Sequence, residues 1–146
     1  MVIRRQGFAV LILIGVLAAC SSQSPMPAAT SAPAAKVEVE GGSYANVTPQ
    51  QLAELLKQKD FFFVNVHIPY EGEIELTDAQ IPYDQTAQQL SQYPADKNAK
   101  IVLYCRSGRM SSIAAKELIK LGYTSVWNLD GGMAAWEQQD LPLKER

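Results

Sequence analysis

Residues 101–111 read Ile-Val-Leu-Tyr-Cys-Arg-Ser-Gly-Arg-Met-Ser, and the fold of the chain is decided in this stretch. Its first four residues form a short, continuous apolar run, which is typical of a strand buried on both faces of a parallel sheet. The run passes directly into a polar loop that begins at Cys105. From Ser111 onward apolar residues recur at helical spacing until Gly122, so the stretch predicts a strand, a tight loop and a helix in succession.

Similar strand and helix patterns flank this unit on both sides. Thr48-Pro49-Gln50-Gln51 predicts a helix start, with threonine as N-cap, proline at the first helical position and glutamine completing a capping box. Buried strands are predicted over 61–66 and 125–129, a brief edge strand at Ile81-Pro82, a short helix from Asp84 through Leu90, a turn over 130–132 and a last helix over 133–138. Alternation of strands with helices predicts an α/β fold, a doubly wound parallel sheet with helices on both faces.

The first nineteen residues predict an export signal. Arg4 and Arg5 precede an uncharged apolar stretch, 8–17, that is too short for a comfortable membrane span. Its end, Leu17-Ala18-Ala19-Cys20, resembles the lipobox of bacterial lipoproteins, which implies cleavage before Cys20 and acylation of that residue. A plain transmembrane anchor explains the small residues before the cysteine less well. The resemblance therefore implies a lipid-anchored, extracytoplasmic protein at the periplasmic face of the bacterial cell envelope, with Ser21 compatible with the outer membrane.

The rest of the chain divides into a tether and one domain. Residues 20–42 are rich in Ser, Pro, Ala and Gly, which predicts a flexible tether after the lipidated Cys20, and residues 43–146 have the apolar patterns of a packed domain. The formal net charge is −2 and the charges are scattered along the chain. This distribution argues against a nucleic-acid partner.

Cys105 is the candidate nucleophile. If Cys20 carries lipid, Cys105 has no partner for an intramolecular disulfide in a compartment that favours disulfides. It follows a buried strand at its carboxyl end, where open α/β sheets bind ligands, and the loop N–H groups and the helix N-terminus can stabilise a thiolate there. A buried structural cysteine is the alternative, which the polar residues after it disfavour. The candidate substrate-binding residues are Arg106, Ser107, Gly108, Arg109, Met110 and Ser111.

Two blocks of sequence, 104–111 and 129–136, resemble signatures of the rhodanese family, and the likeness extends over about residues 43–146. The resemblance implies a single-domain rhodanese fold and sulfurtransferase activity. Cys105 would take a sulfane sulfur from a donor such as thiosulfate, hold it as a persulfide and pass it to cyanide or a thiol. The implied partners are thus a small sulfur-containing anion and a thiol acceptor.

The sequence departs from the family pattern at three places. Met110 stands where thiosulfate-using relatives often have arginine, for which Arg106 and Arg109 are expected to compensate in part. Asn65-Val66-His67 replaces the usual Asp-Val-Arg, so a charge pair is lost. The usual Gly-His-Ile-Pro-Gly-Ala block is absent from the segment 71–82. These departures leave the identity of the sulfur donor open.

His67, the only histidine, is expected at the same edge of the sheet as Cys105, as an auxiliary group with proton transfer or metal binding as its candidate roles. No spacing of cysteines, histidines and carboxylates completes a metal site, so neither a metal nor a cofactor is expected. Glu71, Glu73 and Glu75 are interpreted as solvated side chains of a surface loop.

Two other classes of function compete with sulfur transfer. One is a non-catalytic rhodanese-fold binding or regulatory module at the cell envelope, with an unidentified protein partner and with Met110 and Asn65 as marks of a relaxed site. The other is phosphate or arsenate chemistry, because related folds include cysteine phosphatases and arsenate reductases. Those proteins place five residues between cysteine and arginine, whereas here the sixth residue after Cys105 is Ser111, which disfavours that chemistry.

Overall fold

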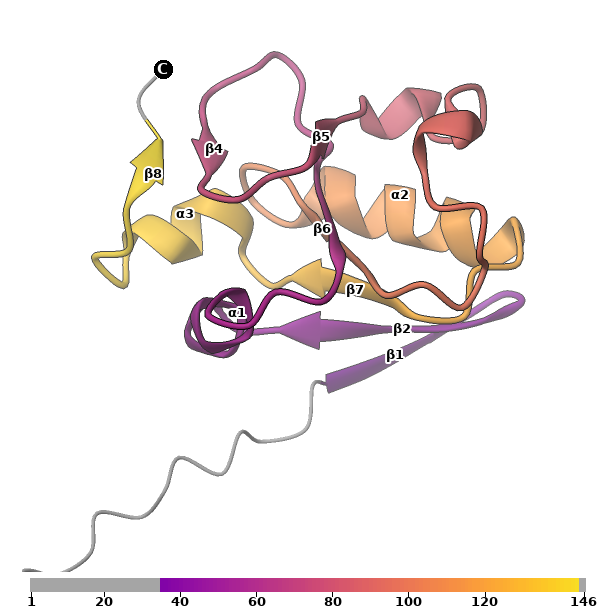
Figure 1. Ribbon diagram of the computed structural model, residues 1–146, viewed down its shortest axis with the longest axis horizontal. Coiled ribbons are helices and arrows are strands. Elements are labelled where there is room, and N and C mark those ends of the chain that lie inside the picture. Colours follow the sequence, from indigo (N-terminus) through magenta and orange to yellow (C-terminus); the bar gives the residue numbers. More distant parts are fainter. Residues whose placement is uncertain (1–34, 145–146) are drawn as a thin grey trace, which may run out of the picture. The chain divides into compact units, whose positions relative to one another are not determined.

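The computed structural model describes residues 35–144, so the predicted signal 1–19 and the lipidation site Cys20 lie outside the described residues. Within residues 35–144, six strands form one sheet in the order β1-β2-β7-β6-β3-β5 (Figure 1). Their bounds are β1 Ala35–Val39, β2 Gly42–Val47, β3 Phe62–Asn65, β5 Ala79–Gln80, β6 Ile101–Tyr104 and β7 Val126–Leu129.

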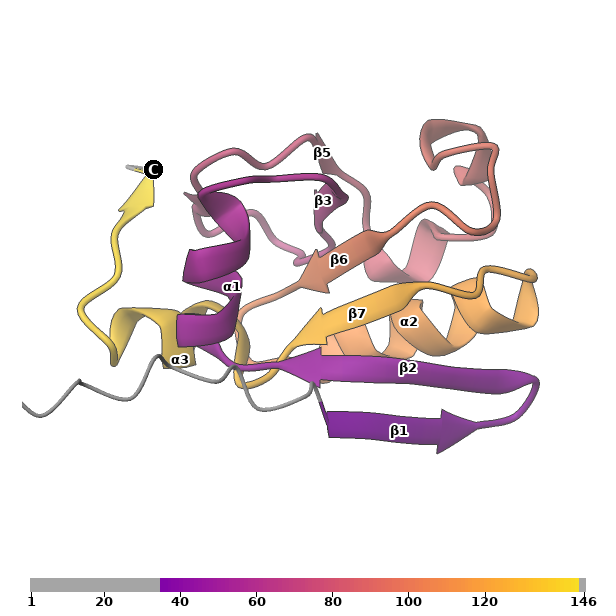
Figure 2. The same ribbon diagram turned by 60° about the horizontal axis from the view of Figure 1, so that its bottom comes forward.

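The sheet is parallel from β2 to β5, and only β1 pairs antiparallel, with β2. The arrows of β2, β7 and β6 all point the same way, so their carboxyl ends meet at one edge (Figure 2). Register pairs Asn65 at the end of β3 with Tyr104 at the end of β6. The residues after these two strands, among them His67 and Cys105, therefore lie at the same edge, as the sequence predicts.

Helices cover both faces of the sheet, which confirms the predicted doubly wound arrangement. Helix α2 (Arg109–Lys120) lies on one face, and α1 (Pro49–Leu56) and α3 (Gly132–Glu137) lie on the other (Figure 2). Each face has its own apolar core, in which Leu118 of α2 and Leu52 of α1 are fully buried. Burial of one such side chain contributes about 1.5–3 kcal/mol. None of the helices within residues 35–144 combines the length and the apolar character needed to cross a membrane.

The helix ends follow the signals read from the sequence. Thr48 caps α1, with its Oγ1 accepting from the Gln51 N–H at 3.2 Å while the Gln51 side chain accepts from the Thr48 N–H at 2.9 Å. After α2, Gly122 has φ of 90°. The N–H of Gly122 donates to the Ile119 carbonyl and that of Tyr123 to the Leu118 carbonyl, which is the Schellman pattern that ends a helix at glycine.

The structure differs from the sequence prediction in three segments. Residues 20–42 were expected to form a tether, but strand β1 lies within this range. The segment is ordered because its backbone pairs with β2 and Val37 packs on the core, so the prediction is wrong for residues 35–42. The helix predicted from Asp84 through Leu90 is replaced by two short 3₁₀ helices, η1 (Tyr83–Gln85) and η2 (Leu90–Gln92), since few apolar side chains there could anchor an α-helix. The edge strand β5 ends just before the predicted Ile81-Pro82.

A second, two-stranded sheet was not predicted. Strand β4 (Glu73–Ile74) pairs antiparallel with β8 (Leu143–Lys144), which brings the end of the described chain against the loop after β3. The hydroxyl of Tyr104, fully buried at the end of β6, accepts from the Ile74 N–H at 3.1 Å and lies 2.7 Å from the Thr77 hydroxyl. These contacts fix the loop between β3 and β5 relative to the strand that carries Cys105.

Replacement of Tyr104 by phenylalanine tests this anchor. At neutral pH we expect Tyr104→Phe to lower the free energy of unfolding by about 1–2 kcal/mol, because the Ile74 N–H and the Thr77 hydroxyl lose a buried partner. Burial raises the pKa of Tyr104 from 10.0 to about 12, so the folded state favours the neutral phenol. The stability this gives to the wild type is present below pH 10 and is lost as the pH rises from 10 toward 12, so the difference between the two proteins should narrow.

Urea unfolding of both proteins at neutral and alkaline pH measures this difference. The pKa of Tyr93 is also raised to about 12 by burial, but Tyr93 is present in both proteins and cancels. Equal stability at neutral pH, or a gap that is the same at both pH values, would contradict the role given to Tyr104.

Candidate active site

Cys105 lies immediately after β6 and is 1% exposed. Two donors point at its sulfur. The backbone N–H of Gly108 donates to Sγ at 3.1 Å, and the hydroxyl of Ser111 donates to Sγ at 3.4 Å. A thiol with polar donors aimed at it is in a position suited to holding negative charge on sulfur, and this arrangement contradicts a purely apolar role for Cys105.

The loop after Cys105 wraps around the sulfur because of Gly108. That residue has φ of 85°, a left-handed conformation that L side chains rarely adopt, and it is also the N-cap of α2. The turn therefore passes directly into the first turn of α2, whose N-terminus favours negative charge. Of the other predicted binding residues, Ser107 and Arg109 are exposed, and Met110 is half-buried against the core under α2.

The start of α3 clamps the other side of the loop. The N–H of Met133 donates to the Cys105 carbonyl and that of Ala134 to the Arg106 carbonyl, both at 2.9 Å. This contact needs Gly132, because a Cβ there would lie 2.3 Å from the Cys105 carbonyl oxygen and 2.8 Å from the Gly108 nitrogen. From the sequence, Gly132 was predicted only as part of a turn. The sequence signal that could have found this contact is the Gly131-Gly132 pair, and both residues have positive φ in the structure.

Arg106 does not turn toward the sulfur to receive an anion. Its Nη1 lies 2.5 Å from Oε2 of Glu137 in α3, and its Nε lies 3.8 Å from Oε2 of Glu71 in the loop after β3. Two carboxylates hold its guanidinium group, and the expectation that Arg106 and Arg109 compensate in part for Met110 stays a prediction. The interpretation of Glu71 as a merely solvated side chain is wrong, because Glu71 lies close to both His67 and Arg106.

His67 lies beside this ion-paired group. It is 7% exposed, its Nε2 is 3.3 Å from the same Oε2 of Glu71, and within residues 35–144 neither ring nitrogen has a hydrogen-bond partner. Asn65, fully buried, accepts from the His67 N–H and donates through Nδ2 to the Gly72 carbonyl, both at 3.0 Å. Because an aspartate could only accept, the amide at position 65 lets one side chain bridge the strand and the loop that carries Glu71.

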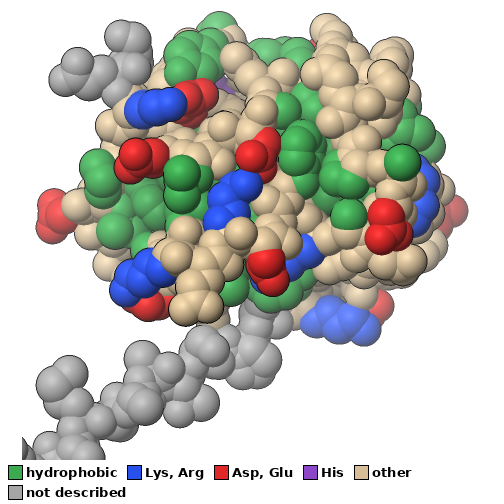
Figure 3. Space-filling view, in the orientation of Figure 1, with side chains coloured by type: hydrophobic (Ala, Val, Ile, Leu, Met, Phe, Trp, Pro, Cys, Tyr) green, Lys and Arg blue, Asp and Glu red, His purple; other side chains and the backbone are tan. Residues whose placement is uncertain are grey.

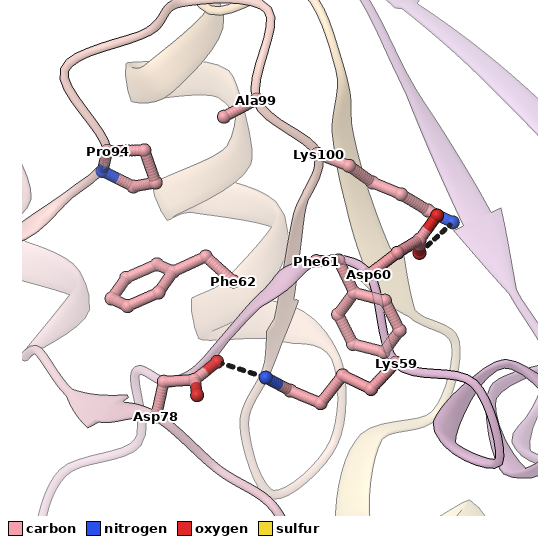
Figure 4. Close-up of a pocket in the computed structure, with 8 residues that line it drawn as sticks. All are labelled: Lys59, Asp60, Phe61, Phe62, Asp78, Pro94, Ala99 and Lys100. Atoms are coloured by element: carbon pink, nitrogen blue, oxygen red, sulfur yellow. Dashed lines mark hydrogen bonds and ion pairs between the residues drawn. The ribbon is translucent and has the colours of Figure 1, made fainter.

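The opposite edge of the sheet has a depression of about 400 Å³. In Figure 4, Lys59 points toward Asp78 and Lys100 toward Asp60, at 2.6 and 3.4 Å, so each cation there already has a carboxylate partner. Within residues 35–144 no group of three or more His, Cys, Asp and Glu side chains could hold a metal ion. On the face in Figure 3, acidic and basic side chains are interspersed. The chemistry of the described chain is thus concentrated at Cys105.

Comparison with known proteins agrees with this geometry. The rhodanese-like domain family matches residues 48–139. The chain belongs to the rhodanese family. A relative named sulfurtransferase, from Allochromatium vinosum, is 35% identical over 64% of this chain and 85% of its own length. The thiosulfate sulfurtransferase GlpE of Vibrio cholerae is 28% identical over 62% of this chain and 85% of its own length. The solution structure of the rhodanese-like domain of Alr3790 from Anabaena, at 23% identity, has a TM-score of 0.61 and covers 69% of this chain and 79% of that domain.

Within this rhodanese domain, the sixth position after the cysteine separates the site from that of a cysteine phosphatase. Ser111 stands there, fully buried at the start of α2, and its hydroxyl lies near both Sγ of Cys105 and the Gly108 carbonyl, which is 3.2 Å away. A phosphatase-type loop would need an arginine at or just beyond this position. The donors to the sulfur here are instead the uncharged Gly108 N–H and Ser111 hydroxyl.

The Gly132 clamp gives a direct prediction. Gly132→Ala should lower the free energy of unfolding by roughly 2–4 kcal/mol, because the added Cβ clashes with rigid backbone and the residue has φ of 58°. Gly122→Ala is the matched control: its φ is 90° but nothing lies within 4 Å of the added Cβ, so it should lose only about 1 kcal/mol. Denaturant unfolding of both variants measures these changes. An equal decrease in the free energy of unfolding for the two variants would show that the close approach of α3 to the loop does not contribute to stability.

Proposed function

We propose that this rhodanese is a sulfurtransferase that moves sulfane sulfur through a persulfide on Cys105. The observation that carries the proposal is the pair of donors aimed at the sulfur, the Gly108 N–H and the Ser111 hydroxyl. The names of the relatives from A. vinosum and V. cholerae support sulfur transfer as the class of reaction.

The reaction has two displacements at sulfur. In the first, the Cys105 thiolate attacks the outer sulfur of a donor such as thiosulfate, the donor S–S bond breaks, and sulfite leaves with the bonding electron pair. In the second, cyanide or a thiolate attacks the outer sulfur of the persulfide and leaves with it, which regenerates the Cys105 thiolate. No oxidant or reductant is consumed, and donors in the loop are needed in both steps because the charge stays on sulfur.

The surroundings of Cys105 suit a persulfide intermediate. The terminal sulfur of a persulfide is an anion, and we expect the positive partial charge at the N-terminus of α2 and at loop N–H groups such as that of Gly108 to stabilise it. Because Cys105 is 1% exposed, we expect bulk water to be kept from the inner sulfur of the intermediate. The rigid clamp by α3 keeps these groups in place between the two steps.

Mass spectrometry tests the proposal directly. Incubation with a sulfane donor should add one sulfur atom to the protein, the added mass should map to the peptide with Cys105, and cyanide should remove it as thiocyanate. Cys105→Ser should abolish the adduct, whereas Ser112→Ala, at a hydroxyl that donates to the Arg109 carbonyl away from the sulfur, should leave it unchanged. A folded protein that forms no adduct with thiosulfate or with a persulfide would overturn the proposal and favour a binding module.

We also propose that the protein works at the bacterial cell envelope, anchored by lipid on Cys20. The support is the Leu17-Ala18-Ala19-Cys20 sequence after a short apolar stretch. Several acyl chains on one residue would give stable anchoring, since each buried methylene contributes about 0.8 kcal/mol and a single chain is marginal.

Replacement of Cys20 tests this location. Cys20→Ser should abolish metabolic labelling with a fatty acid and move the protein out of the detergent-extracted membrane fraction. The Cys105→Ser variant is the control, because it leaves Cys20 in place and should remain labelled. Labelling of the Cys20→Ser variant at the wild-type level would contradict the proposed anchor.

A further inference from the structure

The charged side chains next to Cys105 in the loop and those that pair with them balance one another. Arg106, the residue after the cysteine, is held between Glu137 of α3 at 2.5 Å and Glu71 of the loop after β3 at 3.8 Å. Arg109 is the other arginine of the loop, and its side chain is exposed. The two arginines and the two carboxylates leave no formal excess of positive charge for a multiply charged anion.

The position of each carboxylate is built into the fold. Glu137 is the last residue of α3, the helix whose first turn clamps the cysteine loop. Glu71 precedes Gly72, whose carbonyl is held by the Asn65 side chain, and β4, which follows, pairs with β8. Helix α3 and the loop after β3, each anchored by its own contacts, therefore hold Glu137 and Glu71 next to Arg106.

We propose that Glu71 and Glu137 determine the donor specificity of this site. They hold Arg106, and they select against a dianionic donor such as thiosulfate in favour of a persulfide of an aminothiol, of which cysteine persulfide is the simplest. This inference rests on the proposed sulfurtransferase function.

The argument for this donor is electrostatic. Thiosulfate brings two negative charges to a site where Glu71 and Glu137 already offset the charge of Arg106, so no net positive charge attracts it. Met110, half-buried and apolar, adds no positive charge to offset them. Cysteine persulfide carries one negative charge on its reacting end, and its ammonium group balances its own carboxylate. Its net negative charge is thus half that of thiosulfate, and its ammonium group can pair with Glu71 or Glu137.

The transfer balances without another reagent. The Cys105 thiolate attacks the outer sulfur of R–S–S⁻, the S–S bond of the donor breaks, and R–S⁻ leaves with the electron pair. Cys105 then carries the persulfide anion, so both the number of sulfur atoms and the total charge are unchanged.

Single-turnover loading of Cys105 by the two donors, followed by mass spectrometry of the full chain, tests the inference. The wild type should load faster from cysteine persulfide than from thiosulfate. The double variant Glu71→Gln, Glu137→Gln should load from thiosulfate about fivefold to tenfold faster than the wild type at low salt, and the gain should shrink at high salt. Its rate with cysteine persulfide should stay the same or fall.

Glu73→Gln is the matched control. It also removes one acid from the loop after β3, but Glu73 pairs with Lys144 at 3.2 Å and not with Arg106. Its thiosulfate rate should stay within about twofold of the wild type, because no charge next to Arg106 changes. Urea unfolding of each variant separates a change in specificity from a loss of fold.

Two results would overturn the inference while leaving the proposed function in place: faster loading of the wild type by thiosulfate, or a double variant whose donor preference equals that of Glu73→Gln. Loading by neither donor would instead overturn the proposed function, and the inference with it.

Discussion

The rest of the site depends on two backbone hydrogen bonds between α3 and the cysteine loop. The N–H of Met133 donates to the Cys105 carbonyl, and the N–H of Ala134 donates to the Arg106 carbonyl. They hold these two carbonyls toward α3, while the N–H of Gly108, farther along the same loop, donates to the sulfur. They are possible because Gly132 has no Cβ to separate the two backbones. The same contact joins the helix on one face of the sheet to the loop that starts the helix on the other face.

The groups that donate to the Cys105 sulfur are a backbone N–H and a serine hydroxyl and not arginine side chains. The nearest donors are an amide and a hydroxyl, and the N-terminus of α2 adds its dipole. Arg106, which follows the cysteine directly, is held by Glu71 and Glu137. In the proposed function, the donors of the loop would stabilise charge on the sulfur, and the carboxylates around Arg106 would act on the choice of donor.

The family resemblance and the departures from it lie in different parts of the molecule. The two strand-loop-helix blocks that resemble rhodaneses form the cysteine loop and its clamp. The unusual segment after β3 forms the rim, with His67, Glu71 and the Asn65 bridge between strand and loop. This segment is anchored by the buried Tyr104 hydroxyl at the end of β6 and by the pairing of β4 with β8.

The sequence by itself determined the elements whose signals are local: the buried strand 101–104, the capping box at Thr48, the glycine stop at Gly122, and the place of Cys105 at the carboxyl edge of the sheet. Only the tertiary structure decided which way Arg106 points, that Gly132 touches the cysteine loop, and that β1 joins the sheet. The physical reason is the range of the interaction. Period and capping depend on neighbours along the chain, whereas Arg106 and Glu137 are 31 residues apart and meet only because the fold brings α3 to the loop.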